Sequence, residues 1–134
     1  DGLAGRELDV SSCPDLVPPL AAVAAFAEGV TRITGAARLR LKESDRIATV
    51  SAAINSLGGR ATALDDGLVI EGALELAGGT VDAANDHRIA MMAAVMAGRC
   101  AGPVTILGAE CVNKSYPAFF EDLSSLGGNV RKES

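Results

Sequence analysis

The chain has 134 residues, enough for one domain with a sizeable core. Apolar residues make up 49% of the sequence and aromatic residues only 3%, so we expect a core of Ala, Val, Leu and Ile. The net charge of −5 argues against nucleic acid or an anionic membrane as the main partner. The longest apolar run, residues 89–97, is far shorter than the roughly 20 residues that span a bilayer.

The cysteine pattern indicates reduced thiols. Cys13, Cys100 and Cys111 are odd in number and show no C-x-x-C spacing, so we expect neither a disulfide framework nor a metal site. No signal peptide is recognisable, and we therefore expect a cytoplasmic protein. The chain begins with Asp1 rather than Met, which is compatible with a piece of a longer protein.

The first half of the chain predicts alternating strands and helices, followed by a hairpin. Residues 20–27 are apolar on every side, as in a fully buried helix, whereas Ile47, Val50, Ile54 and Leu57 give a later helix one apolar face. The predicted elements are a strand (7–12), the apolar helix (20–27), a strand (30–34), a short extended segment (39–41), the amphipathic helix (44–57) and a hairpin (60–64 and 68–71) around Asp65-Asp66-Gly67.

The same order of elements returns in the second half. Gly35-Ala36 matches Gly108-Ala109, and Ser-Leu-Gly-Gly occurs at both 56–59 and 125–128. The predicted elements are a strand (79–84), an all-apolar helix (89–97), a strand (104–107), an amphipathic helix that starts at Pro117 and a final strand that begins at 129–132.

The repeat predicts an α+β fold, with mixed sheets packed around buried helices. We expect a single domain, 1–134, of two β-α-β-α-β-β units at about 7–72 and 79–134, the second without its last strand. The core should include Leu20, Val23, Ile89, Met92 and Val95.

Polar motifs precede all four predicted helices. Right-handed β-α-β connections point the helices of one sheet the same way, so their N-termini should gather at one edge. Lys42, Arg46, Arg88 and Lys114 would meet there and suit a doubly anionic ligand. Arg46 is notable because a helix dipole disfavours a cation in the first turn, and a bound anion would explain it. The alternative is a solvated, charged loop.

Taken singly, these residues have simpler interpretations. Asp15, Asp45 and Asp86 could each cap a helix, and Asp45 could also pair with Arg46. His87 is the only histidine and has no Cys or His at a spacing useful for binding a metal. Glu43 lies among basic residues, which stabilise the carboxylate, so a role in proton transfer would require burial.

Four motifs resemble those of the EPSP synthase (3-phosphoshikimate 1-carboxyvinyltransferase) family. They are Lys-Glu-Ser-Asp-Arg-Ile at 42–47, Asp-His-Arg-Ile-Ala-Met at 86–91, Lys-Ser-Tyr-Pro at 114–117 and Pro14-Asp15. The resemblance covers nearly the whole chain. It implies that the chain is the last two of three β-α-β-α-β-β units in the C-terminal lobe of a longer, two-lobed enzyme.

The resemblance implies transfer of the enolpyruvyl group of phosphoenolpyruvate to the 5-hydroxyl of shikimate 3-phosphate, without metal or organic cofactor. Asp15, Glu43 and His87 are then the expected catalytic residues: Asp15 binds the shikimate hydroxyls and accepts a proton, and Glu43 works at the methylene carbon. Lys42 would contact shikimate 3-phosphate. Phosphoenolpyruvate would be held by Arg46, Arg88 and Lys114, with His87 supporting that cluster.

Two departures limit what the resemblance carries over. Arg38 stands where some members have an asparagine that contacts shikimate, and the lysine, arginine and serines of the N-terminal lobe are not in this sequence. We therefore expect the chain to hold half a site, to be inactive alone and to leave apolar surface uncovered where the third unit would pack. The alternatives are a UDP-N-acetylglucosamine enolpyruvyl transferase-like domain and a non-catalytic anion-binding domain.

Overall fold

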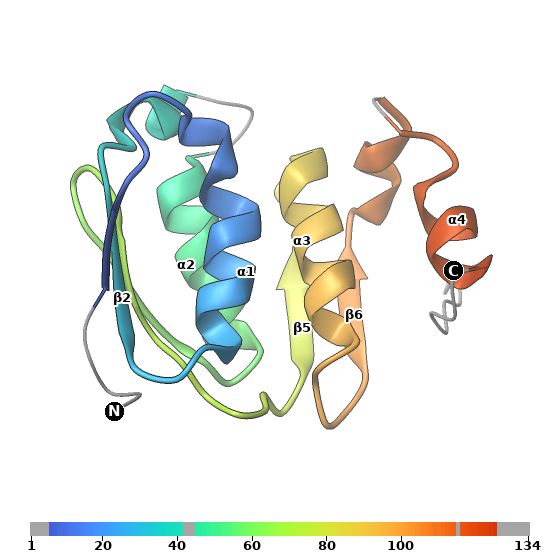
Figure 1. The fold of residues 1–134 in the computed structure, drawn as a ribbon. Coiled ribbons are helices and arrows are strands. Elements are labelled where there is room, and N and C mark those ends of the chain that lie inside the picture. Colours follow the sequence, from blue (N-terminus) through green and yellow to red (C-terminus); the bar gives the residue numbers. More distant parts are fainter. Residues whose placement is uncertain (1–5, 42–44, 115, 126–134) are drawn as a thin grey trace.

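The computed structural model describes residues 6–41, 45–114 and 116–125 (Figure 1). The elements are, in chain order, β1 (Arg6–Asp9), the 3-10 turn η1 (Pro14–Leu16), α1 (Val17–Phe26), β2 (Val30–Thr34), η2 (Ala37–Leu41), α2 (Arg46–Ser56), β3 (Arg60–Ala63), β4 (Leu68–Glu71), β5 (Gly79–Asp82), α3 (His87–Ala97), β6 (Val104–Leu107), η3 (Ala109–Lys114) and α4 (Phe119–Ser125). The predicted order of strands and helices is confirmed. The segment before α2 is a 3-10 helix rather than extended, and the strand expected at 129–132 lies outside the described residues.

Two sheets carry the helices, and the predicted α+β class is confirmed. The first sheet is mixed and has the order β1-β2-β4-β3, with β1 parallel to β2 and the other pairs antiparallel. The second is a parallel pair, β5 and β6. Each parallel pair is joined through a helix, α1 in the first sheet and α3 in the second, and each pair is followed by a 3-10 turn and another helix (Figure 1).

One apolar core joins the first sheet to α1, α2 and α3. Ile33 of β2 lies opposite Leu68 of β4, and both are fully buried against the helices together with Ile54 of α2. A smaller cluster joins Ala90 of α3 to Cys111 and Val112 of η3. These contacts fix how the starts of the helices lie relative to one another.

The prediction that two helices are buried on every side is wrong. Val23 of α1 is 67% exposed and Val95 of α3 is 58% exposed, while Leu20 is partly buried and Ile89 and Met92 are buried as expected. A helix that is apolar all round carries no mark of which face will be covered, so the sequence could not distinguish Val23 from its buried neighbours.

The turn of the β3–β4 hairpin packs on the segment that follows β2. The backbone of Asp66 accepts a hydrogen bond from the amide of Ala36 at 2.7 Å. A Cβ on Gly67 would lie 1.7 Å from the carbonyl oxygen of Ile33, so only glycine permits this approach. The hairpin is thus brought next to η2, from which the chain runs toward α2.

None of the helices in the described part of the chain is long and apolar enough to cross a membrane.

Candidate functional site

The starts of α1, α2 and α3 lie at one end of the molecule, uppermost in Figure 1. Asp15 in η1, Arg46 at the first position of α2 and Asp86 at the N-cap of α3 interact although they are far apart in sequence. The predicted gathering of helix N-termini is therefore confirmed for these three helices.

Arg46 and Asp86 form a buried, bidentate ion pair. Nε of Arg46 donates to Oδ2 of Asp86 at 2.9 Å, and Nη2 donates to Oδ1 at 3.2 Å. Their side chains are 3% and 0% exposed. Two parallel bonds between a guanidinium and a carboxylate fix orientation as well as distance, so this pair locks the start of α2 to that of α3.

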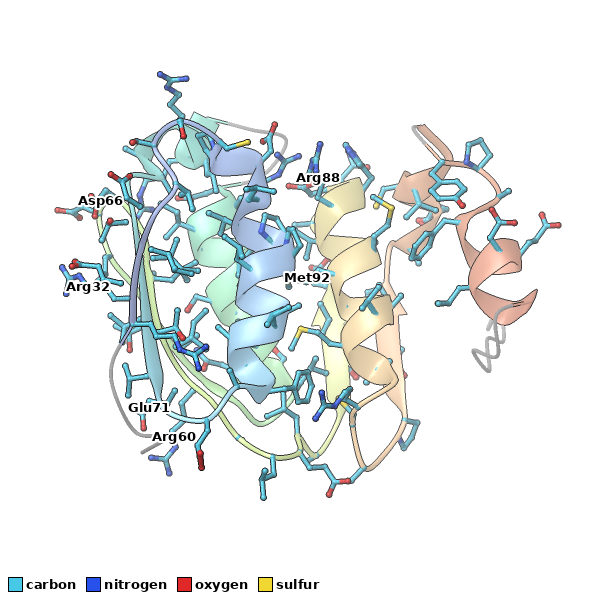
Figure 2. All side chains as sticks on the ribbon, viewed as in Figure 1. Arg32, Arg60, Asp66, Glu71, Arg88 and Met92 are labelled. Atoms are coloured by element: carbon cyan, nitrogen blue, oxygen red, sulfur yellow. The ribbon has the colours of Figure 1, made fainter. Side chains whose placement is uncertain are left out.

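Asp86 also caps α3, as the sequence predicted. Its Oδ1 accepts a hydrogen bond from the backbone amide of Arg88 at 3.1 Å. One carboxylate therefore satisfies a free N–H of α3 and two donors of Arg46. His87 and Arg88 follow the cap as the first residues of α3, and Figure 2 shows Arg88 at this end of the helix.

Asp15 is the second carboxylate near Arg46. Its Oδ1 lies 3.4 Å from Nη1 of Arg46, and its side chain is 49% exposed. The guanidinium thus lies between a buried and a half-exposed carboxylate. These two charges already compensate for the unfavourable position of Arg46 in the first turn, and a bound anion at this position stays a prediction.

The chain reaches the Asp86 cap through a turn with uncommon backbone angles. Ala84 and Asn85 have φ of 54° and 56°, and the amide of Asp86 bonds to the carbonyl of Ala83 at 2.9 Å. Asparagine tolerates this left-handed region but alanine does so rarely, and such angles cost on the order of 1–3 kcal/mol each. Because strain of this kind often accompanies functional sites, the turn supports the choice of this edge as the site. The sequence reasoning missed it.

Asp45 caps α2, which the sequence also predicted. Its Oδ1 accepts from the amide of Ala48 at 3.3 Å, while its Oδ2 lies 2.7 Å from Nη1 of Arg40. The structure therefore gives Asp45 an ion pair with Arg40.

Only some of the remaining candidates can be placed. Lys42 and Glu43 lie outside the described residues. Lys114 is the last residue of η3, which packs against α3, but its side chain is likewise not described. His87 is half-buried at the start of α3. Among the described residues, no group of three or more His, Cys, Asp and Glu side chains could hold a metal ion.

Comparison with known proteins identifies the fold and motifs. The sequence profile of EPSP synthase (3-phosphoshikimate 1-carboxyvinyltransferase) matches residues 1–123. The chain belongs to the EPSP synthase family. The 3-phosphoshikimate 1-carboxyvinyltransferase of Clostridium acetobutylicum is 54% identical over 130 residues, which cover 97% of this chain and 30% of the relative. That of Clostridium kluyveri is 50% identical over 126 residues, or 94% of this chain and 30% of the relative.

Solved structures of the family have the same fold. An EPSP synthase from Acinetobacter baumannii superimposes with a TM-score of 0.84 at 41% identity, covering 93% of this chain and 30% of the other. A second structure of EPSP synthase from this organism gives a TM-score of 0.76 at 38% identity, covering 87% of this chain and 27% of the other. The family predicted from the four motifs is thus confirmed. The chain spans about 30% of the length of these curated relatives.

Proposed function

We propose that this chain is part of the C-terminal lobe of a two-lobed 3-phosphoshikimate 1-carboxyvinyltransferase. The longer enzyme would move the enolpyruvyl group of phosphoenolpyruvate to the 5-hydroxyl of shikimate 3-phosphate, in aromatic amino-acid biosynthesis. The observation that carries the proposal is the joining of Asp15, Arg46 and Asp86 at one end of three helices, in a chain of this family. Residues 1–134 would form one domain with repeat units at about 7–72 and 79–134.

The reaction requires a series of proton transfers, with one C–O bond formed and another broken at C2 of phosphoenolpyruvate. In the addition step the 5-oxygen of shikimate 3-phosphate bonds to C2, its proton passes to Asp15, and the methylene carbon gains a proton from Glu43. In the elimination step the methyl group returns a proton to Glu43 and the C2–O bond to phosphate breaks, and the released phosphate takes up the proton that Asp15 had accepted. Positive charge builds at C2 in each step, and nearby carboxylates stabilise it.

Cations would hold the two anionic groups of phosphoenolpyruvate. We assign this role to Arg46, Arg88 and Lys114, with His87 in support, and assign the phosphate of shikimate 3-phosphate to Lys42. Arg46 is already paired with two carboxylates, so it is not free to bind an anion without rearrangement. Asp15 is the more exposed and more distant of the two, and we propose that the incoming anion replaces it at Nη1 of Arg46.

This exchange would couple binding to chemistry. When an anion takes the place of Asp15 beside Arg46, the Asp15 carboxylate becomes available to the 5-hydroxyl of the second substrate. The same movement therefore binds phosphoenolpyruvate and supplies the base. The two named substrates and the N-terminal lobe that would complete the site are part of the same proposal.

Neutral isosteres in the longer enzyme test the catalytic assignment. Asp15→Asn and Glu43→Gln keep the shape of each side chain and remove its proton-transfer function, so we expect kcat to fall by about 100-fold or more. Glu71→Gln, at an exposed carboxylate of β4 whose arginine partner lies 4.0 Å away, is a control that should leave kcat unchanged. The measurement is the rate at which phosphate is released from phosphoenolpyruvate when both substrates are present. Equal kcat in parent and both isosteres would remove Asp15 and Glu43 from the mechanism.

The 134-residue chain alone should bind anions weakly and turn nothing over. The ligand would be held from one side, with its charge mostly solvated and screened by salt. We expect dissociation constants for phosphate or phosphoenolpyruvate on the order of millimolar. In an NMR titration, shifts should concentrate at the amides of residues 45–47, 86–89 and 114–116 and fade with added salt. Shifts centred on the hairpin near Asp66 would contradict the proposed site.

A further inference from the structure

Arg40 joins three segments of the chain through one guanidinium group. Its Nη2 donates to the carbonyl of Leu64 at 2.6 Å, and its Nε donates to the carbonyl of Asp65 at 3.0 Å. Leu64 directly follows β3, and Asp65 lies in the turn of the β3–β4 hairpin. Nη1 of Arg40 donates to Oδ2 of Asp45 at 2.7 Å. Arg40 itself lies in η2, so the hairpin, η2 and the cap of α2 meet at this side chain.

Asp45 extends this connection into α2. Its Oδ1 caps the amide of Ala48, and its backbone carbonyl accepts from the amide and the hydroxyl of Thr49 at 2.8 and 3.0 Å. The two oxygens of one carboxylate therefore serve different segments, with Oδ1 on α2 and Oδ2 on Arg40. The next residue is Arg46, whose guanidinium is bound by the carboxylate of Asp86.

Stability alone does not account for this arrangement. The Arg40 and Asp45 side chains are 36% and 37% exposed, and ion pairs of that exposure contribute little to folding. The geometry is specific nonetheless, because two neighbouring carbonyls and one carboxylate accept from three different nitrogens. Only arginine offers donors in such a planar fork, whereas a lysine ammonium is a single point of charge. The three contacts of Arg40 therefore fix the orientation of the segments that they join more than they add to the free energy of folding.

We propose that Arg40 is a positioning residue, which uses the rigid β3–β4 hairpin to set the start of α2 and with it the guanidinium of Arg46. This inference rests on the proposed function. Arg40 touches neither substrate in this scheme. It acts through Asp45, and its loss would let the first turn of α2 shift while the core of the helix, packed through Val50 and Ile54, stays in place.

Hydrogen exchange of the 134-residue chain tests the connection directly. In Arg40→Ala and Arg40→Lys, the amides of Ala48 and Thr49 should exchange about tenfold faster, the scale of a lost cap, while amides of β4 change little. Arg60→Ala is the matched control, because Arg60 is an exposed arginine whose carboxylate partner lies 4.0 Å away. If Arg40→Ala does not fold, Asp45→Asn keeps a cap-forming side chain but removes the charge facing Arg40, and it should show a smaller increase at the same amides.

Kinetics of the longer enzyme separate positioning from stability. A merely structural role would lower the amount of folded enzyme, and so the apparent kcat, and leave KM unchanged. A positioning role should raise KM for phosphoenolpyruvate about tenfold in Arg40→Ala and Arg40→Lys, with no change in Arg60→Ala. Exchange at Ala48 and Thr49 no faster than in the control, or an unchanged KM, would overturn the proposal. A parent enzyme without turnover would instead contradict the proposed function, and the exchange result would still decide the role of Arg40.

Discussion

Asp86→Asn should be the most damaging isosteric change at this edge of the molecule. The Asp86 carboxylate is fully buried and accepts hydrogen bonds from two nitrogens of the Arg46 guanidinium and from the amide of Arg88. Asparagine has nearly the same shape and can still accept one or two of these bonds. It loses the negative charge, and its amide group would place an N–H donor against a donor of Arg46.

The loss of folding free energy in Asp86→Asn depends on the burial of the ion pair and on the contact that Arg46 keeps with Asp15. Removing one partner of a buried ion pair costs about 3–5 kcal/mol, because an uncompensated charge stays buried. Arg46 keeps Asp15 at 3.4 Å, but that carboxylate is half exposed and makes a longer contact. We therefore expect the lower end of the range, about 3 kcal/mol, which is a large part of the roughly 5–15 kcal/mol that stabilises a typical domain.

Urea unfolding of the 134-residue chain measures this loss. With a denaturant dependence of about 1–3 kcal/mol per molar urea, the midpoint should fall by roughly 1–3 M. Glu71→Gln is the control, since its pair with Arg60 is exposed and 4.0 Å long, and it should cost less than about 1 kcal/mol. Adding Arg46→Met to Asp86→Asn should recover stability by removing the buried cation. An Asp86→Asn variant as stable as the control would refute the reasoning that Asp86 is the main compensation for Arg46.

Three further outcomes are expected. Cys13 is exposed, whereas burial raises the pKa of the Cys100 thiol, so Cys13 should react first with a thiol reagent at neutral pH; equal rates would contradict this. The hydrogen bond from Tyr116, the only tyrosine, to Asp122 raises the pKa of the phenol above its ordinary value; ultraviolet titration should show this, and Asp122→Asn should bring the midpoint down. Asp15→Asn should tighten phosphate binding by the 134-residue chain several-fold, since a competing carboxylate is removed, and a weaker affinity in the NMR titration would count against the exchange at Arg46.

Much of the fold could be predicted because its signals are local. The spacing of Ile47, Val50 and Ile54 marks a helix with one apolar face, and all three are fully buried in α2. Asp45 and Asp86 were recognisable as caps, because each precedes an apolar helical stretch and has a side chain that can accept from free amides. The Asp-Gly signal at 66–67 correctly placed the hairpin turn.

The errors concern partners that are distant in sequence. Val23 and Val95 are as apolar as their neighbours, and only tertiary packing decides which side of an all-apolar helix is covered. The strand expected to continue to residue 84 ends at Asp82, because Ala84 adopts a left-handed turn that nothing in its side chain indicates. Arg40 escaped notice because two of its three acceptors are backbone carbonyls, which leave no trace in the sequence.

Arg46 illustrates what a helix position can and cannot indicate from sequence alone. Its place in a helix N-terminus drew attention to this edge, and the structure does bring three helix starts together around it. Yet Arg46 and Arg88 carry two positive charges, and Asp15 and Asp86 carry two negative ones. The described side chains at this edge therefore offer an anion no net attraction. Under the proposed function, affinity would come from Lys42 and Lys114 and from displacement of Asp15. If the proposed exchange at Arg46 holds, the second substrate would occupy the Asp15 carboxylate that the first ligand displaces, and binding of the two substrates of a transfer reaction would be coupled.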